Sequence, residues 1–326
     1  MLDQYSRNID YIRISVTDRC NLRCIYCMPQ TRKTYLRQEE LLTYDEIVKL
    51  AGIYRSLGIK NVKLTGGEPL VREHVDELIF RLKEECGMEK VTLTTNGILL
   101  GQQLEGIVKA RLDGVNISLD TLNPEHYNRL TGSCNAGKKP SDSNLEAVLW
   151  GMRKAQKQAG ISVKVNCVLM HQTREELLAL AELAKDGVNV RFIELMPIGH
   201  AEVGDWYGFV SNQEILDRFP ELIPADDEKF SVSKNYRLPD GKGKVGLISA
   251  LSNHFCASCN KIRLTSDGKI KPCLHSNEEI DMKGPLRLSD EELLDALRAS
   301  VGHKVEHHML NEGAAPIERD MNKIGG

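Results

Sequence analysis

Short β-branched runs alternate with amphipathic segments from the start of the chain to Pro197. The strand-like runs are YIRISV, NVKLTG, KVTLTT, GVNISL, SVKVNCVLM and VNVRFIELM. Between them lie segments with apolar residues at helical spacing, such as TYDEIVKLAGIYRSLG, REHVDELIFRLKEE and TREELLALAELAKDG, the last ending on Gly187 as a C-cap. Six βα units in series predict a parallel sheet with helices outside it. Because a complete barrel has eight units, an open partial barrel and a doubly wound sheet both fit this pattern.

The alternation stops after Pro197, which indicates a second, smaller region. SNQEILDRF predicts a helix, and a loop-rich stretch then leads to NKIRLTSDGKIKPCL, a predicted β-hairpin with Asp267 and Gly268 in its turn. GSCNAGKKPSDSN is predicted to be a loop between two βα units. We therefore divide the chain into a barrel domain over residues 1–200 and a C-terminal region over residues 201–326.

Composition and charge narrow the class of protein. Hydrophobic residues make up 41% and charged residues 27% of the 326 positions, and apolar runs such as VGLISAL are far shorter than the roughly 20 residues of a membrane span. The first residues, MLDQYSRNIDYIRISV, resemble neither a signal peptide nor a transit peptide. A net charge of -3 does not favour binding to nucleic acid or to a membrane. We expect a cytoplasmic protein.

Six of the nine cysteines fall into two groups of three, which is unusual for a chain expected in a reducing compartment. Cys20, Cys24 and Cys27 form the pattern C-x3-C-x2-C in the loop after the first predicted strand. A zinc site normally takes a fourth Cys or His ligand, and the first histidine of the chain is His74. Three thiolates can hold three irons of a [4Fe-4S] cluster and leave the fourth iron open. This loop is therefore a candidate iron-sulfur site.

The second group is Cys256, Cys259 and Cys273, in FCASCN and KPCL. His254 and His275 flank these cysteines and could complete a zinc tetrahedron, so the spacing supports zinc and a second cluster equally. The remaining cysteines stand alone and are interpreted as structural thiols: Cys86, Cys134 and Cys167.

Cations interrupt strands that should be apolar. Buried parallel strands normally read as nearly continuous hydrophobic runs, yet four of the six carry a cation in mid-run: Arg13, Lys63, Lys164 and Arg191. A buried cation needs an acidic partner, such as Glu194, or an anionic ligand. A salt bridge or a strand-end charge that reaches solvent would explain any single one. The four together favour a pocket for a polyanion.

Two further features extend this picture. Lys261 and Arg263 follow Cys259 directly and would continue the positive lining beside the second cysteine group, which suits a triphosphate. The chain ends in MNKIGG. Two terminal glycines are typical of a frayed end, but they would also let the backbone enter a narrow site where a Cβ atom would collide.

The first cysteine group and a glycine motif carry a resemblance to a known superfamily. CNLRCIYC, together with GGEP at Gly66 to Pro69, resembles the radical S-adenosylmethionine (SAM) superfamily. The resemblance implies that the amino and carboxylate groups of SAM bind the open iron, which accounts for three thiolates instead of four. It also implies a partial (β/α)6 barrel of the TIM type.

Motifs along nearly the whole chain resemble one branch, the GTP 3',8-cyclase family of molybdenum cofactor biosynthesis. They are RISVTDRCNLRCIYCMP, LTGGEPLVR, LTTNG, NISLDTL, VKVNCV, RFIELMPIG, FCASCN, SDGKIKPCL and the IGG terminus. The resemblance implies a second [4Fe-4S] cluster on Cys256, Cys259 and Cys273, with the guanine of GTP on its open iron. The SAM contacts that it implies are Tyr26, Gly67, Ser118 and Met196. The GTP contacts that it implies are Arg13, Lys63, Thr94, Lys164, Lys261, Ile262 and Arg263, with Arg191, Gly325 and Gly326 as further candidates.

The same resemblance implies the reaction and its partners. One electron entering the first cluster cleaves SAM, and the resulting 5'-deoxyadenosyl radical takes the 3' hydrogen of GTP. Attack of the ribose radical on C8 gives (8S)-3',8-cyclo-7,8-dihydroguanosine 5'-triphosphate, the first step of molybdopterin biosynthesis. The implied partners are an electron donor such as a flavodoxin or ferredoxin and a downstream cyclic pyranopterin monophosphate synthase, and a homodimer is left open.

Two positions depart from the family pattern. Lys261 stands where the family usually has the first Arg of Arg-x-Arg; lysine keeps the charge but loses the planar fork of a guanidinium. His275 occupies a place expected to be apolar. Two rival hypotheses remain, a peptide-modifying radical SAM enzyme with an auxiliary cluster and a non-catalytic zinc scaffold. The segment HKVEHH would place His303 and His307 four apart on a helix face, which we expect to be solvated.

Overall fold

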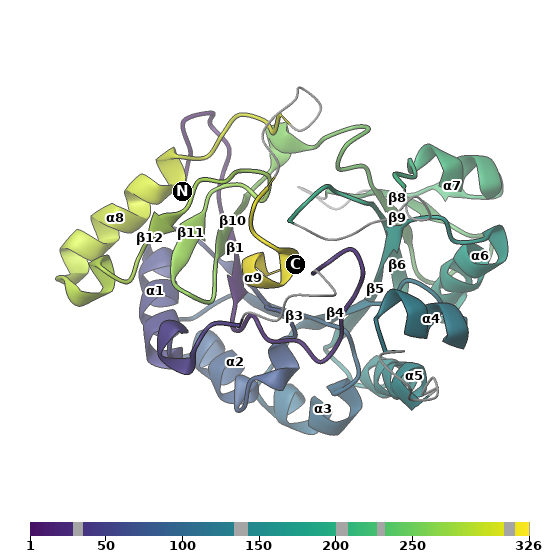
Figure 1. The fold of residues 1–326 in the computed structure, drawn as a ribbon, viewed down its shortest axis with the longest axis horizontal. Coiled ribbons are helices and arrows are strands. Elements are labelled where there is room, and N and C mark those ends of the chain that lie inside the picture. Colours follow the sequence, from purple (N-terminus) through teal and green to yellow (C-terminus); the bar gives the residue numbers. More distant parts are fainter. Residues whose placement is uncertain (29–34, 134–142, 200–207, 227–231, 310–316, 326) are drawn as a thin grey trace.

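The computed structural model describes residues 1–28, 35–133, 143–199, 208–226, 232–309 and 317–325. Within these ranges twelve strands form one strongly curved sheet, in the order β12-β11-β10-β1-β2-β3-β4-β5-β6-β9-β8-β7 (Figure 1). The strands are β1 (Tyr11–Ser15), β2 (Asn61–Thr65), β3 (Lys90–Thr95), β4 (Gly114–Ser118), β5 (Ser162–Leu169), β6 (Asn189–Glu194), β7 (Ile223–Pro224), β8 (Lys234–Arg237), β9 (Val245–Ile248), β10 (Lys261–Leu264), β11 (Lys269–Lys271) and β12 (Ile280–Asp281).

The parallel part of the sheet is an open barrel. The six strands expected from the sequence, β1 to β6, are all present and lie in sequence order. A doubly wound sheet reverses its strand order near the middle, so the partial barrel is the correct alternative. β10 adds to the sheet in parallel beside β1, and β9 adds in parallel beside β6. These two strands lie at opposite ends of the parallel run and do not pair with each other, so the barrel stays open.

Helices cover the outer face of the curved sheet (Figure 1). The described α-helices are α1 (Tyr44–Ser56), α2 (Val75–Glu84), α3 (Leu100–Lys109), α4 (Pro124–Leu130), α5 (Ser143–Gln156), α6 (Arg174–Glu182), α7 (Gln213–Arg218), α8 (Asp290–Gly302) and α9 (Met321–Ile324). Capping boxes start α1 and α6, where Thr43 pairs with Glu46 and Thr173 with Glu176. A 3-10 turn continues α6 to Gly187, the expected C-cap. Of the helices described, none is long and apolar enough to cross a bilayer.

The C-terminal region is more regular than its sequence suggests. The hairpin is confirmed, since β10 and β11 pair antiparallel around a turn that contains Gly268. The loop-rich interpretation of the stretch before it is partly wrong, because β7, β8 and β9 lie there. β9 and β10 share the barrel's sheet and hydrophobic core, and the division at residue 200 stays a prediction. The helical interpretation of HKVEHH is also wrong, because α8 ends at Gly302 and His303 bonds Glu278.

The chain returns to the inside of the barrel at its C-terminal end. Figure 1 shows α9 and the C-terminus within the curve of the sheet. Ile198, Ile317 and Ile324 form a small separate core that fixes this segment beside the end of β6. Arg319 adds ion pairs to Asp267 in the hairpin turn and to Glu279. The tail is therefore packed in place, not frayed, as far as Gly325.

Candidate cluster and nucleotide site

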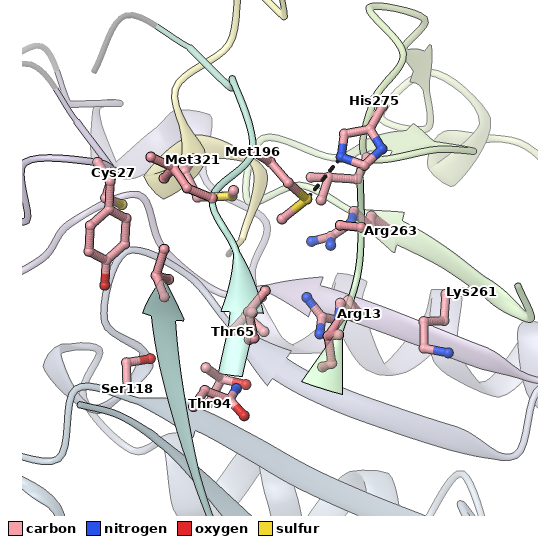
Figure 2. A pocket seen from close by; sticks show the side chains of 18 of the residues that line it. Arg13, Cys27, Thr65, Thr94, Ser118, Met196, Lys261, Arg263, His275 and Met321 are labelled. Carbon is pink, nitrogen blue, oxygen red and sulfur yellow. Dashed lines mark hydrogen bonds between the residues drawn. The ribbon is translucent and has the colours of Figure 1, made fainter. Parts of the chain in front are cut away.

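A cavity of about 310 Å³ opens inside the curve of the sheet, and both cysteine groups line it. Parallel barrels place their chemistry at the C-terminal ends of the strands. The cavity begins there, beside Thr65 and Ser118, and continues along the inner face of β1 and β10 to Lys261 at the start of β10. The sequence-predicted site residues that line it are Cys20, Cys24, Cys27, Tyr26, Gly67, Ser118, Met196, Arg13, Thr94, Cys256, Cys259, Cys273, Lys261 and Arg263. Figure 2 shows Arg13, Lys261 and Arg263 together on one side and Cys27 and Ser118 on the other.

The first cysteine loop packs directly against the glycine motif that follows β2. The N–H of Gly67 donates to the carbonyl of Thr17 at 2.7 Å, and the N–H of Glu68 donates to that of Arg19 at 2.8 Å. A Cβ atom at residue 67 would lie 2.6 Å from the Asp18 carbonyl oxygen, so only glycine allows this approach. The glycines of the motif therefore hold the residues just before Cys20.

Glu68 supports this loop through hydrogen bonds to neighbouring residues. Sequence reasoning did not identify it as a site residue, although it belongs to the GGEP motif. Its buried carboxylate accepts hydrogen bonds from the N–H of Leu70 at 3.0 Å, the hydroxyl of Thr95 at 2.7 Å and the N–H of Asn96 at 2.6 Å. Burial raises the pKa of Glu68 to about 7 despite these donors. The Asn96 side chain in turn donates to Asn21 at 2.7 Å, within the cysteine loop.

The thiols of this loop suit metal binding. Burial raises the pKa of Cys20 to about 11 and that of Cys27 to about 12, and it also raises the pKa of Cys24. Buried thiolates at neutral pH therefore need a metal charge to replace their protons. Among the described residues no three His, Cys, Asp or Glu side chains converge as for a single ion. Thiolates of a four-iron cluster bind separate irons and need not converge on one point.

Tyr26, between Cys24 and Cys27, is fixed by a residue that the sequence did not single out. Its hydroxyl donates to Asp120 at 2.8 Å, and the same carboxylate accepts from the N–H of Val168 at 2.8 Å. Burial raises the pKa of Asp120 to about 6. The NISLDTL motif contains Asp120 directly after Leu119, which is the signal that could have revealed it.

The second cysteine group lies at the β10-β11 hairpin. Cys256 is in a 3-10 turn, Cys259 precedes β10, and Cys273 follows β11. Burial raises the pKa of Cys259, but the ammonium of Lys304 and the backbone N–H of Lys261 outweigh it, so the pKa lies below its usual value. Lys304 was not expected at the site. This second group therefore has one thiol in a positive environment.

Histidines border the second group, but among the described residues no three His, Cys, Asp or Glu side chains converge there as for a single zinc ion. His275 lies with Nε2 3.0 Å from the sulfur of Met196, the proposed SAM contact (Figure 2). The ring centroids of His275 and His308 are 4.7 Å apart, and those of His254 and His308 are 5.4 Å apart. Burial, followed by His308 and Arg263, lowers the pKa of His275 to about 3. His275 is thus a neutral imidazole between the two halves of the cavity.

Strand register brings the mid-strand cations together. Arg13 on β1 lies opposite Arg263 on β10 and opposite Lys63 on β2. In-register residues of parallel strands point to the same side of the sheet, and here that side is the barrel interior. Burial, and then Arg13, Arg191 and other cations, hold the pKa of Lys63 well below its usual value. The Nε atom of Arg13 is buried and has no hydrogen-bond partner in the described structure.

Among the described residues that line the cavity, no carboxylate forms an ion pair with these cations. Of the described residues that line it, the acidic ones are Glu68 and Glu194. Glu194, which sequence reasoning offered as a salt-bridge partner, accepts from the N–H groups of Asn212, Leu251 and Ser252. The carboxylate of Glu68 accepts the three hydrogen bonds described above, from Leu70, Thr95 and Asn96. The cavity wall at β10 and β1 is therefore positive and suits an anion with several charges.

The other proposed GTP contacts in the described structure are not among the residues that line the cavity: Lys63, Lys164, Arg191 and Ile262. Lys164 on β5 is opposite Asn116, which is opposite Thr94, and Arg191 on β6 is opposite Asn166. The side chain of Ile262 is fully buried in the core, so it can reach a nucleotide only through its backbone.

The diglycine tail reaches the same wall. Arg263 donates to the carbonyl of Gly325 at 2.6 Å. Gly325 has φ 85°, and a Cβ atom there would collide with the Thr65 hydroxyl and approach Ser15 Cβ at 2.9 Å. The interpretation that glycine allows the backbone into a narrow site therefore fits Gly325. Gly326 lies outside the described residues.

Residues 14–184 match the family described as Radical SAM superfamily, and residues 188–310 match the family described as Molybdenum Cofactor Synthesis C. Curated relatives match over all of this chain and all of their own length. A GTP 3',8-cyclase of Alkaliphilus oremlandii is 43% identical over 329 residues, and one of Moorella thermoacetica is 42% identical over 335 residues.

Solved structures are more distant and show the fold alone. Streptococcus suis SuiB bound to S-adenosylmethionine is 16% identical, with a TM-score of 0.61 over 98% of this chain and 77% of that chain. Native anSMEcpe with bound AdoMet is 18% identical, with a TM-score of 0.58 over 89% and 84%. Together with the full-length relatives and the two matched families, this fold shows that the chain belongs to the GTP 3',8-cyclase family of the radical SAM superfamily.

Proposed function

We propose that this enzyme converts GTP to 3',8-cyclo-7,8-dihydro-GTP with SAM as cosubstrate, the first step of molybdenum cofactor biosynthesis. Full-length relatives at up to 43% identity carry the name GTP 3',8-cyclase. The observation that carries the proposal is the cavity itself, in which two three-cysteine groups from opposite ends of the chain share walls with a row of buried and half-buried cations. A non-catalytic protein with structural zinc sites would not need such a cavity.

Cys20, Cys24 and Cys27 would hold the first [4Fe-4S] cluster, and Cys256, Cys259 and Cys273 the second. When bound, the first cluster supplies the electron that cleaves SAM, and the second offers an open iron to guanine. The assigned SAM contacts are Tyr26, Gly67, Ser118 and Met196. Asp120 holds the Tyr26 ring in place through its carboxylate, so the aromatic surface beside the first cysteines is fixed before SAM binds.

The GTP side of the cavity binds charge. Arg13 and Arg263 face the interior from adjacent strands. Lys261 lies two residues before Arg263 on β10 and therefore on the same face of the strand. Their guanidinium and ammonium groups would hold the triphosphate, with Lys63, Thr94, Lys164, Ile262, Arg191, Gly325 and Gly326 as the remaining assigned contacts. A substrate fixed at both ends presents its ribose to the SAM side, which lowers the entropic barrier of the reaction.

The partners and location belong to the same proposal. A flavodoxin or ferredoxin would supply electrons, a cyclic pyranopterin monophosphate synthase would take the product, and the enzyme would act in the cytoplasm, as a monomer or homodimer. A peptide-modifying radical SAM enzyme is not favoured, because Arg13, Lys261 and Arg263, which line the cavity, have no evident role with a neutral peptide.

Anaerobic turnover with GTP deuterated at the ribose 3' carbon tests the function. The reconstituted protein is incubated with SAM and a reductant, and 5'-deoxyadenosine is analysed by mass spectrometry. Deuterium in 5'-deoxyadenosine is expected, because the hydrogen at that carbon is the one removed. Unlabelled 5'-deoxyadenosine formed equally with and without GTP would contradict GTP as the substrate, but it would still show that the enzyme cleaves SAM.

A further inference from the structure

Lys304 is a buried cation beside the second cysteine group, and none of the roles above uses it. It follows α8 and is 2% exposed. Its ammonium donates to the carbonyl of Lys261 at 2.9 Å, to the carbonyl of Pro272 at 3.1 Å and to the sulfur of Cys259 at 3.5 Å. The ammonium thus touches one cysteine and the residue directly before Cys273.

The N-terminal segment of the chain holds the backbone of the loop that carries Lys304. Gln4 donates to the carbonyl of Lys304 at 3.2 Å. Arg7, itself buried beside Asp3, donates to the carbonyls of Val305 at 2.7 Å and Cys256 at 3.0 Å. The N-terminal segment therefore binds both the lysine-bearing loop and the cysteine loop, which keeps Lys304 at a constant distance from Cys259.

No carboxylate of the described residues pairs with Lys304, and its three acceptors are two carbonyls and a sulfur. Lys271, the neighbouring buried lysine on β11, differs in this respect, because it has Glu279 at 3.5 Å and the carbonyl of Ser276 at 2.6 Å. A buried charge without a counter-charge is unfavourable. Lys304 therefore lacks a negative partner that Lys271 has.

We propose that Lys304 provides the counter-charge of the second cluster, donating to the Cys259 thiolate and stabilising the reduced, more negative form. The inference rests on the proposed function, because it takes Cys256, Cys259 and Cys273 to hold a [4Fe-4S] cluster. Hydrogen bonds to ligand sulfur and nearby positive charge both raise a cluster's reduction potential. Lys304 is thus a positioning residue that sets the electronic character of the iron facing the substrate.

The test uses full-length, anaerobically reconstituted Cys24→Ala protein, in which the second cluster is observed without the first. Lys304→Met, Lys304→Arg and Lys271→Met are added to it, and the midpoint potential is measured by EPR-monitored redox titration, with iron and sulfide content. We expect Lys304→Met to lower the reduced-to-oxidised ratio at least tenfold at a given potential, a shift of about 59 mV for one electron. Lys304→Arg and Lys271→Met should leave the potential near that of the parent.

Each other outcome has a defined meaning. A parent-like potential in a fully loaded Lys304→Met protein would overturn the inference while leaving the second cluster in place. If Lys304→Met loses its iron but Lys304→Arg and Lys271→Met keep theirs, the charge is needed for the cluster and the inference holds. Equal iron loss in Lys304→Met and Lys304→Arg would show that Lys304 serves packing, not charge. A parent that binds no iron would contradict the second cluster itself and overturn both proposals.

Discussion

At the scale of single residues, the site depends on cations that the barrel would not need for folding. Arg263, 8% exposed, donates to Gly325 on one side and lies in register with Arg13 on the other. Burial and the neighbouring Arg13 lower the pKa of Arg263 to about 9. These groups gain a full counter-charge only when an anion binds, so part of the binding energy of GTP is stored as unfavourable charge in the free enzyme.

Lys261 gives this charge a pH dependence. Burial lowers its pKa to about 8, so it is protonated below that pH and neutral above it. We expect kcat/KM for GTP, which reports the free enzyme, to fall as the pH rises through about 8. In Lys261→Arg the fall should move to higher pH, because guanidinium keeps its proton. Lys109→Met, an exposed change on α3, is the control. An identical pH profile in Lys261→Arg would contradict the assignment.

At the scale of elements, the tail and the first two strands meet within the barrel. α9 contributes Ile324 to the small core that it forms with Ile198 and Ile317, and it places Gly325 against β1 and β2. Arg319 holds the segment before α9 to the β10-β11 hairpin. The hairpin that carries Arg263 is therefore tied to the segment whose carbonyl Arg263 binds.

Gly325→Ala tests this arrangement. The φ of 85° costs an alanine about 1–2 kcal/mol, and its Cβ would meet Thr65 and Ser15. We expect kcat/KM for GTP to fall at least about tenfold, with SAM cleavage in the absence of GTP retained. Turnover and GTP binding by calorimetry measure this. Gly302→Ala, where no atom lies within 4 Å of the new Cβ, is the matched control. Wild-type turnover in Gly325→Ala would mean that the tail has no part in catalysis.

At the scale of the whole molecule, one sheet brings together cysteines that are more than two hundred positions apart. β10, which begins directly after the Cys256 and Cys259 segment, pairs in parallel with β1, which leads into the loop of Cys20. The two cysteine groups therefore belong to adjacent strands, one at the start of β10 and the other beyond the end of β1. Each group offers three thiols to the same cavity, which leaves an open coordination position on each side for a different small molecule.

Metal content distinguishes two clusters from one cluster and a zinc ion. The anaerobically reconstituted enzyme should contain about eight irons per chain, and Cys24→Ala and Cys256→Ala should each contain about four. Elemental analysis by inductively coupled plasma mass spectrometry, with a sulfide assay, measures the iron, zinc and sulfide content per chain. A wild-type protein with about four irons and one zinc, whose zinc is lost in Cys256→Ala, would show that the second site is structural.

The sequence by itself determined most of what depends on neighbours along the chain. The six strands of the barrel, the capped helices and the turn at Gly268 follow from local periodicity and turn chemistry. The cation at Arg13 was visible because it interrupts an apolar strand. The cysteine motifs were visible because the first group lies on one loop and the second flanks one hairpin.

The tertiary structure decided what depends on pairing between distant segments. β9 and β10 are four residues long, and they join the parallel strands of the barrel by pairing with β6 and β1. Asp120 and Lys304 carry ordinary sequence signals, yet they act on Tyr26 and Cys259, 94 and 45 positions away. A local pattern records which residues can form a strand or a loop. Contacts over such separations arise only when the whole sheet curves around the cavity, because register and packing of every strand together fix which side chains meet.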